Sequence, residues 1–326
     1  MPDSALVSVI LPAFDVAPYV AEAVTSVAEQ DWPEIELVAV DDGSSDGTAN
    51  ILRAISREWR GPGRRMIFIP QENAGAGAAR NAGVAAATGD TLLFLDADDR
   101  LATDLVRRMI TALDAAPDAE IAFPCWHYID QDGRDFGHAS PPANGSFSAV
   151  DIMIDNPLHS ASGVTVRRAA AERAGGFDPT LAACIDLDFW VRAAPQGGKA
   201  ILSVPEAIAF YRRRPGQITG NWRRMERGWT RVCEKLAEAG RPLNPEDWRR
   251  GRARQCLFWS HIAYQSGEYT AARLLMVECW RRDPRFAASD DLARIRSLSV
   301  VASLLPAPLH DRLRARFNAR RDGQGD

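Results

Sequence analysis

The stretch Thr91-Leu92-Leu93-Phe94-Leu95-Asp96-Ala97-Asp98-Asp99 (residues 91–99) decides the fold of this chain. It joins a short apolar run, which is typical of a buried strand, to three carboxylates at the point where that strand would reach the surface. Because packed carboxylates repel one another and raise one another's pKa, they need a cation nearby. Mg²⁺ and Mn²⁺ prefer oxygen ligands, so the stretch predicts a divalent metal.

Asp96 and Asp98 can reach one ligand together, because alternate side chains of an extended strand point to the same side. A solvated acidic turn before a helix, capped by Thr103 or Asp104, is the alternative for this motif taken alone.

A second acidic pair, Asp41 and Asp42, follows the apolar run 35–40 and opens the loop Gly43-Ser44-Ser45-Asp46-Gly47-Thr48. A turn with a helix cap at Asp46 is the alternative interpretation of this loop. Two acidic strand ends in one α/β pattern indicate a single cleft, since ligands of such sheets bind beyond the carboxyl ends of the strands.

Apolar runs alternate with alanine-rich helical patterns through the first two thirds of the chain. We expect strands near 6–11, 35–40, 65–69, 91–95, 120–128 and 200–204, and helices near 18–29, 46–58, 74–87 and 103–115. This alternation is typical of βαβ units, whose right-handed crossovers give a mostly parallel sheet with helices on both faces. The fold class is therefore α/β.

The composition changes after Pro215-Gly216 to arginine- and tryptophan-rich helical segments, so we expect one domain over residues 1–215 and a helical region over 216–326. The first part holds 18 basic and 30 acidic side chains, the second 21 and 13. A basic region suits an anionic partner such as lipid headgroups, or docking on its own acidic domain. The stretch 292–317 mixes Leu, Val and Arg as an interfacial helix does, although Pro306 and Pro308 interrupt it.

Composition excludes several classes of protein. The five cysteines form no C-x-x-C pair, so neither a disulfide framework nor a thiolate zinc site is indicated. The start of the chain lacks the pattern of a signal peptide, and no apolar run approaches the length of about 18 residues that a membrane span requires. We therefore expect a cytoplasmic protein.

A glycine-rich segment, Glu72 to Gly83, leads into a helix and could present backbone N–H groups to a phosphate. A dinucleotide-binding motif is disfavoured, because Arg80 stands in place of the third glycine and the segment follows the third strand rather than the first.

Together these motifs resemble the inverting family 2 glycosyltransferases of the GT-A fold, over roughly residues 5 to 215. The resemblance is carried by Val7-Ser8-Val9-Ile10-Leu11-Pro12-Ala13-Phe14, Val40-Asp41-Asp42-Gly43-Ser44, Glu72-Asn73-x-Gly75-x-x-x-Ala79-Arg80-Asn81-x-Gly83 and Leu95-Asp96-x-Asp98-Asp99. It implies a Rossmann-like sheet and transfer of a sugar from a nucleotide-diphosphate donor, most often a UDP-sugar, to an acceptor hydroxyl, with Mn²⁺ or Mg²⁺. It also implies a glycan acceptor for surface polysaccharide or glycolipid synthesis. The basic helical region suits a lipid-linked acceptor, and we expect no nucleic acid partner.

By this resemblance, the nucleotide is held by the backbone at Pro12 and Ala13 and by the side chains of Asp41 and Asp42. Arg80 is expected near the base or the phosphates and Asp96 near the ribose or the sugar. Asp98 is expected on the metal, with Asp99 as a second ligand.

The family places its catalytic base before an aromatic helix, and here Asp186 falls on that position. Ile185 replaces the usual glutamate, which implies a different acceptor or a low activity. The alternatives are a helix-start role for Asp186 and an exposed helical charge for Asp188. Arg214 stands where many relatives carry a metal-binding histidine. A guanidinium cannot ligate a metal but can clamp phosphate, so we expect Arg214, with Arg212, to neutralise the diphosphate and to soften the metal dependence.

Two other functions fit parts of the pattern. A sugar nucleotidyltransferase uses a related fold and metal, but its glycine-rich N-terminal loop is missing, since Leu11 is followed by Pro12-Ala13-Phe14. A catalytically impaired glycan-binding or scaffold protein of the same fold would account for Ile185.

Overall fold

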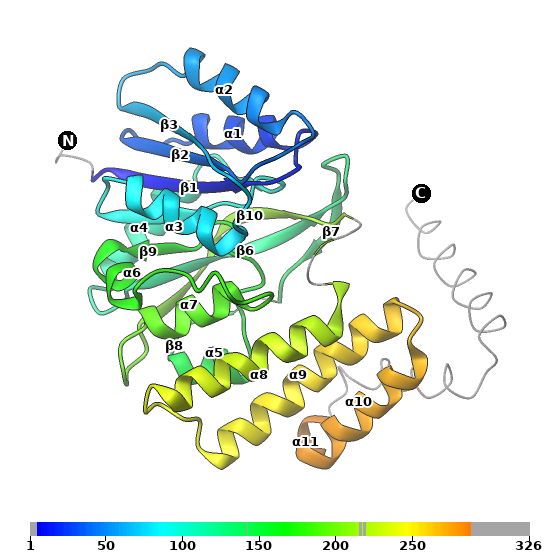
Figure 1. Cartoon of the computed structure of the whole chain (residues 1–326). Coiled ribbons are helices and arrows are strands. Elements are labelled where there is room, and N and C mark those ends of the chain that lie inside the picture. Colours follow the sequence, from blue (N-terminus) through cyan, green and yellow to red (C-terminus); the bar gives the residue numbers. More distant parts are fainter. Residues whose placement is uncertain (1–4, 142, 215–216, 218–219, 288–326) are drawn as a thin grey trace. The chain divides into compact units, whose positions relative to one another are not determined.

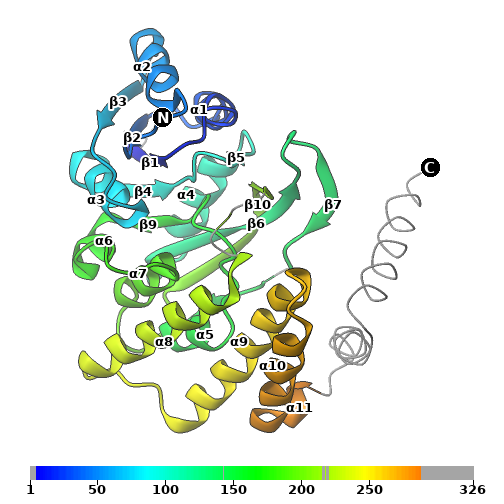
Figure 2. The same cartoon turned by 45° about the vertical axis from the view of Figure 1, so that its right-hand side comes forward.

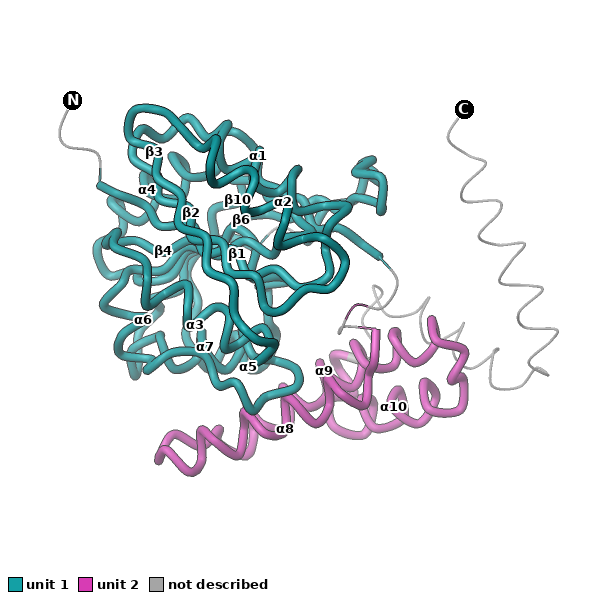
Figure 3. The backbone as a smooth tube through the Cα atoms, turned by 45° about the horizontal axis from the view of Figure 1, so that its top comes forward, with its two compact units in different colours: residues 1–215 teal, residues 216–326 magenta. Residues whose placement is uncertain are grey.

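The computed structural model describes residues 5–141, 143–214, 217 and 220–287. The chain divides into two compact units, Met1–Pro215 and Gly216–Asp326, at the point where the composition changes (Figure 3). Each unit is described by itself below.

The described part of the first unit is built on a ten-stranded sheet with the strand order β3-β2-β1-β4-β9-β6-β10-β5, to which β7 adds beside β6 and β8 beside β10 (Figure 1). The strands are β1 (Val7–Ala13), β2 (Ile35–Asp41), β3 (Arg64–Pro70), β4 (Thr91–Phe94), β5 (Arg100–Leu101), β6 (Ile121–Ile129), β7 (Asp135–Ala139), β8 (Ser146–Phe147), β9 (Thr165–Arg167) and β10 (Ile201–Arg212). Strands β3, β2, β1 and β4 are parallel neighbours, as are β6 and β10, so the predicted α/β class with a mostly parallel sheet is confirmed.

The helices of this unit follow the strands in βαβ order (Figure 2). They are α1 (Val20–Ala28), α2 (Thr48–Glu58), α3 (Ala76–Ala86), α4 (Leu105–Ala115), α5 (Ala149–Ile154), α6 (Arg168–Ala174) and α7 (Ile185–Ala193). Helix α3 packs on β1 and β2, and α4 packs on β6 and β10. Every residue of β2 is buried, which explains why this central strand has a nearly continuous apolar sequence.

Strand β9 (Thr165–Arg167) is an antiparallel strand within the sheet that the sequence pattern did not indicate. Strand β9 lies antiparallel between β4 and β6, where Leu93 pairs with Thr165 and Ala122 pairs with the same residue. A three-residue strand is too short to show a periodicity, so only the finished sheet identifies it. The insertion separates β4 from β6 but leaves their carboxyl ends at the same edge, because both run antiparallel to β9.

The described part of the second unit is helical, as predicted, with α8 (Trp222–Glu238), α9 (Pro245–Gln265), α10 (Tyr269–Arg282) and α11 (Pro284–Ala287). Helix α9 contacts both α8 and α10. The buried rings of Trp229 and Trp259 meet edge to face at 6.2 Å, and Arg252 donates to Glu278 at 3.0 Å and to Glu226. In the described part of the chain, no helix combines the length and the apolar character needed to cross a bilayer. The predicted interfacial stretch 292–317 lies outside the described residues.

Helix α3 depends on a close approach to β1. A Cβ placed on Gly83 would lie 2.6 Å from Cγ2 of Ile10, a residue with no exposed surface.

We expect Gly83→Val to lower the free energy of unfolding by about 1–3 kcal/mol, because the β-branched side chain must displace the packed strand. Ala85→Val places the same side chain at an exposed position of the same helix and serves as the control. Equal denaturation midpoints for the two variants in urea would contradict this explanation.

Candidate active site

The carboxyl ends of β1, β2, β4 and β10 bring the predicted residues together at one edge of the sheet. Ala13 and Asp41 are paired in register as the last residues of β1 and β2. Asp96 and Asp98 follow β4, and Arg212 ends β10. Residues that are separated by more than a hundred positions in sequence therefore lie at one edge because parallel strands share their polarity.

The loops after β1 and β2 are tied to each other by hydrogen bonds. The Ser45 N–H donates to Asp15 Oδ1 at 2.8 Å, and the Ala17 N–H donates to Asp46 Oδ2 at 2.8 Å. Burial works to raise the pKa of Asp46, but hydrogen bonds from Thr48 and Ala17 bring this pKa below its usual value. These hydrogen bonds thus hold the two loops in one arrangement next to Pro12, Ala13 and Asp41.

Asp41 and Asp42 are both buried but have different surroundings. Asp42 accepts hydrogen bonds from the side chain of Gln71 at 2.7 Å and from the N–H groups of Ala74 and Gly75 at 2.9 Å each. Its carboxylate therefore anchors the glycine-rich loop, which corrects our expectation that it contacts the nucleotide. Asp41 accepts from the Ser44 N–H at 3.3 Å through Oδ2, whereas its buried Oδ1 has no hydrogen-bond partner in the described structure.

An unpaired buried acceptor is costly, so Asp41 Oδ1 is suited to a donor that a ligand brings. The neighbouring Phe14 has 47% of its surface exposed at the end of β1. An aromatic face beside an acceptor can bind a planar ring that carries an N–H group.

Arg80 forms an ion pair with Asp96 and acts electrostatically on Asp186. Its Nη2 is 2.6 Å from Asp96 Oδ1, its guanidinium is 5.5 Å from the centre of the Phe177 ring, and its buried Nε has no partner in the described structure. Burial raises the pKa of Asp186; the positive charge of Arg80 opposes this rise and the negative charge of Asp96 adds to it. Asp186, Arg80 and Asp96 are therefore close enough to form one electrostatic group.

Asn81 holds the segment that precedes α7 by two hydrogen bonds. Its side-chain amide donates to the Phe177 carbonyl at 2.8 Å and accepts from the Phe177 N–H at 2.7 Å. A Cβ on Gly77 would lie 3.4 Å from Cγ2 of Ile185, so the beginnings of α3 and α7 are in contact. Ile185 thus packs where the family resemblance implies a carboxylate.

Asp98 is paired with Arg214. The Arg214 Nε is 2.6 Å from Asp98 Oδ2, and the guanidinium also lies 5.9 Å from the centre of the Tyr19 ring. Burial, and then the charge of Asp96, raise the pKa of Asp98, while Arg214 lowers it. The site therefore contains a cation of its own beside the carboxylate that we predicted as the metal ligand.

Arg212 and Asp99 differ from our expectations. Only 1% of Arg212 is exposed, and its guanidinium donates to the backbone carbonyls of Asp98, Asp130 and Gln131 and to the carboxylate of Glu22. It therefore joins the ends of β4 and β10 inside the protein and does not face a diphosphate.

Asp99 is equally enclosed. It accepts from the Arg212 N–H at 2.7 Å and from Ser162 Oγ at 2.5 Å. Burial, with the charges of Asp98 and Asp96, raises its pKa well above the usual value. Both of its oxygens are used by the protein, so Asp99 is better described as a positioning residue than as a metal ligand.

Asp188 is not the exposed helical charge of our alternative interpretation. Its residue is 1% exposed, and Oδ2 accepts from Arg192 Nε at 3.0 Å. Arg192 also donates to the carbonyl of Gly176 at 2.9 Å. These contacts of Arg192 fix the loop that precedes α7, the helix that carries Asp186.

Tyr19, Glu22 and Ser162 belong to the site but could not be recognised from sequence. Each contacts partners that are distant in sequence: Tyr19 lies beside Arg212 and Arg214, Glu22 accepts from Arg212, and Ser162 donates to Asp99. No local pattern marks such pairs.

The acidic residues of the candidate site fit a divalent metal only in part. Among the residues that the model describes, no group of three or more His, Cys, Asp or Glu side chains converges on one point. Mg²⁺ is commonly held by one or two carboxylates together with substrate phosphates. Asp98, with Asp96 two residues before it, suits that arrangement if Arg214 moves away from the carboxylate.

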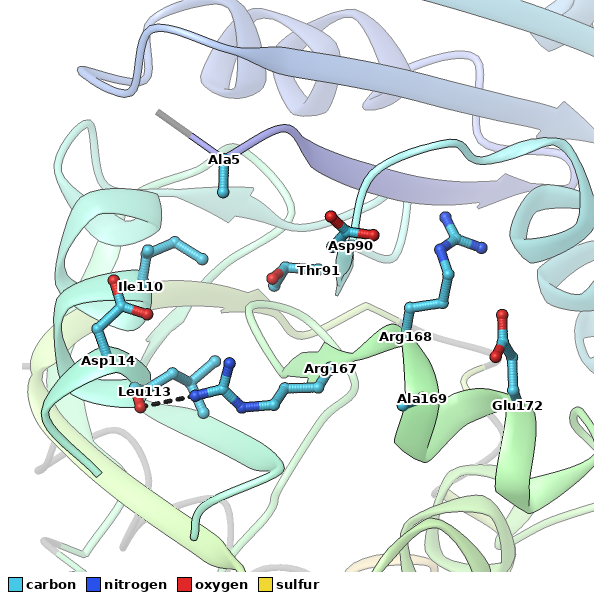
Figure 4. A pocket seen from close by; sticks show the side chains of 10 residues that line it. All are labelled: Ala5, Asp90, Thr91, Ile110, Leu113, Asp114, Arg167, Arg168, Ala169 and Glu172. Carbon is cyan, nitrogen blue, oxygen red and sulfur yellow. Dashed lines mark hydrogen bonds between the residues drawn. The ribbon is translucent and has the colours of Figure 1, made fainter. Parts of the chain in front are cut away.

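A pocket with charged walls lies at the opposite edge of the sheet (Figure 4). Its walls come from the start of β4, the end of β9 and the helices α4 and α6, and include Asp90, Asp114, Arg167, Arg168 and Glu172. Because these residues lie at the amino ends of the parallel strands, this pocket is separate from the candidate active site.

Comparison with known proteins identifies the family. A family model described as Glycosyl transferase family 2 matches residues 8–174. An uncharacterized glycosyltransferase of Rickettsia typhi is 30% identical over 193 residues, which are 58% of this chain and 58% of that protein. The putative teichuronic acid biosynthesis glycosyltransferase TuaG of Bacillus subtilis is 29% identical over 229 residues, 69% of this chain and 86% of TuaG.

Solved structures share the fold. Residues 1–349 of S. aureus TarS in complex with UDP-GlcNAc align with a TM-score of 0.59 and 17% identity over 96% of this chain and 92% of that one. A mannosyltransferase from Pyrobaculum calidifontis in complex with GDP-Man and Mn²⁺ aligns with a TM-score of 0.59 and 20% identity over 93% and 82% of the two chains. The predicted GT-A-type fold is confirmed, and the chain belongs to glycosyltransferase family 2.

Proposed function

We propose that this protein is an inverting glycosyltransferase that moves one sugar from a nucleoside diphosphate, UDP above all, to a hydroxyl of a glycan acceptor. The observation that carries the proposal is the grouping of Asp41, Asp98 and Arg214 at one strand edge that also holds Arg80, Asp96 and Asp186. The complex of TarS with UDP-GlcNAc supports the choice of donor. The teichuronic acid name of the Bacillus relative supports a role in surface polysaccharide or glycolipid synthesis.

In this proposal the two ends of the donor meet different groups. The N–H of the uracil base pairs with Asp41 Oδ1, beside the backbone of Pro12 and Ala13. Asp96 and Arg80 contact the ribose or the sugar. Arg214, released from Asp98, neutralises the diphosphate as negative charge develops on it during departure. A divalent metal on Asp98 would supply the same stabilisation when bound.

Asp186 is the proton acceptor for the attacking hydroxyl. Its buried position raises its pKa, which makes the ionised carboxylate a stronger base than an exposed aspartate. Asn81 and Arg192 hold the segment before α7, and this holds the start of the helix that carries Asp186 in place. Attack from that side, opposite the diphosphate, inverts the configuration of the anomeric carbon.

We place this reaction in the cytoplasm, on the inner face of the cell membrane if the acceptor is lipid-linked. None of the five cysteines forms a disulfide, which suits a reducing compartment. The domain at 1–215 carries the reaction, and the helical region at 216–326 serves a different partner.

Two other functions remain distinguishable by product. A sugar nucleotidyltransferase would release pyrophosphate, whereas the proposed reaction releases UDP. A catalytically impaired glycan-binding or scaffold protein, for which Ile185 is the argument, would bind a glycan and release no UDP from any donor. Screening a panel of nucleotide sugars for release of the free nucleoside diphosphate separates the three.

Asp41→Asn tests the nucleotide contact. We expect the affinity for UDP, measured by isothermal titration, to fall by about one to two orders of magnitude, because a charged acceptor for the base N–H is lost. Asp90→Asn, at the opposite edge of the sheet, is the control and should bind UDP like the unmodified protein. Unchanged affinity in Asp41→Asn would place the base elsewhere. No UDP binding by the unmodified protein would end the transferase proposal.

Asp186→Asn should keep UDP binding and lower kcat by at least about a hundredfold, because the general base is lost while the donor site stays intact. In the unmodified protein kcat/KM should fall as the pH drops through the raised pKa of Asp186, since only the ionised carboxylate accepts a proton. The acidic limb is therefore expected above the ordinary aspartate value of 3.8. Asp118→Asn, an exposed carboxylate on the same unit, controls for charge. Full turnover by Asp186→Asn would refute its role.

Arg214→Ala tests whether the guanidinium of Arg214 neutralises the diphosphate. We expect activity in EDTA to be measurable in the unmodified protein and to disappear in Arg214→Ala, while added Mn²⁺ restores part of it through Asp98. Asp98→Asn should bind UDP more weakly and respond less to Mn²⁺. Loss of activity in EDTA, with no effect of Arg214→Ala, would show that the metal alone neutralises the diphosphate.

A further inference from the structure

Helix α10 of the second unit has an outward face that combines large apolar side chains with arginines. Leu274, Val277 and Trp280 are 59%, 40% and 56% exposed. Arg273 and Arg281 are exposed beside them. These positions recur at intervals of three and four, so they lie on one side of the helix, while Ala272, Leu275 and Cys279 are buried on the other.

Helix α10 contributes no carboxylate to this face. The single carboxylate of α10, Glu278, is half-buried and accepts from Arg252 at 3.0 Å and Arg282 at 2.9 Å. The carboxylate that precedes the helix, Glu268, accepts from Trp222 at 3.2 Å and Arg223 at 2.6 Å. The acidic groups of this segment are thus engaged in ion pairs with their own unit, and the outward arginines are left without a carboxylate of their own helix beside them.

We propose that this face of α10 binds the surface of a bilayer that contains anionic lipids. Leucine, valine and tryptophan on one side of a helix insert at the boundary between headgroups and acyl chains, and flanking arginines bind lipid phosphates. Two copies of the same face would bring arginines together, which disfavours self-association. Residues 288–326 are also basic in composition, with seven arginines and five aspartates, so charge disfavours this segment as the occupant.

The proposal deepens the lipid-linked acceptor of the proposed function but rests on different residues. It would keep the protein at the surface where such an acceptor lies. Vesicle binding and UDP binding are measured separately, so either can fail while the other holds.

Sedimentation of the full chain with vesicles tests the proposal. The unmodified protein should sediment with vesicles of phosphatidylglycerol and phosphatidylcholine, far less with phosphatidylcholine alone, and less at high salt. The triple variant Leu274→Gln, Val277→Gln, Trp280→Gln should lower vesicle affinity by about tenfold or more, since three apolar insertions are lost. Arg273→Gln with Arg281→Gln should remove the preference for anionic vesicles.

Two measurements keep the result interpretable. Thermal melting should show that the variants fold, because the altered side chains are exposed, and Phe136→Gln, an exposed aromatic of the first unit, should bind vesicles like the unmodified protein. The proposal is overturned if the unmodified protein ignores anionic vesicles, or if the triple variant binds them equally well. It is also overturned if light scattering shows a dimer that the triple variant disrupts without any vesicle binding.

Discussion

The structure depends on the compensation of carboxylates that are packed at the ends of parallel strands. Asp96, Asp98 and Asp99 lie within four residues, and each has a separate partner: Arg80, Arg214 and the backbone N–H of Arg212. Without these partners the buried charges would strongly destabilise the fold, because an uncompensated carboxylate in the interior is costly. The same ion pairs hold the guanidinium groups of Arg80 and Arg214 at the carboxyl edge of the sheet.

In each of the two pairs of adjacent aspartates, Asp41 with Asp42 and Asp98 with Asp99, the two side chains have different surroundings. Asp42 and Asp99 are used entirely by the protein, for the glycine-rich loop and for the end of β10. Asp41 keeps a buried oxygen without a partner in the described structure, and Asp98 is paired with Arg214. In our proposal, one carboxylate of each neighbouring pair serves the architecture and the other serves the ligand.

The two departures from the family pattern fit one chemical scheme. Arg214 brings a permanent cation to Asp98, and Ile185 fills the contact between α3 and α7 with an apolar side chain. In our proposal the first reduces the dependence on a metal, and the second leaves Asp186 as the lone base. The helical unit adds a basic and apolar face on α10 whose proposed partner is a lipid surface.

The α/β class, the parallel sheet and the family could be predicted from the sequence alone, because apolar periodicity and the motifs around Asp41, Arg80 and Asp98 are local in the chain. It also identified the segments that meet at the carboxyl edge, since parallel strands share their polarity. The three-dimensional arrangement was needed to identify which of these polar groups are enclosed by the protein itself. Arg212 and Asp99 are enclosed because their partners, Glu22 and Ser162, come from segments far away in sequence. The pairing of strand β9 is likewise seen only in the folded structure, since three residues are too few to show a pattern that predicts a pairing.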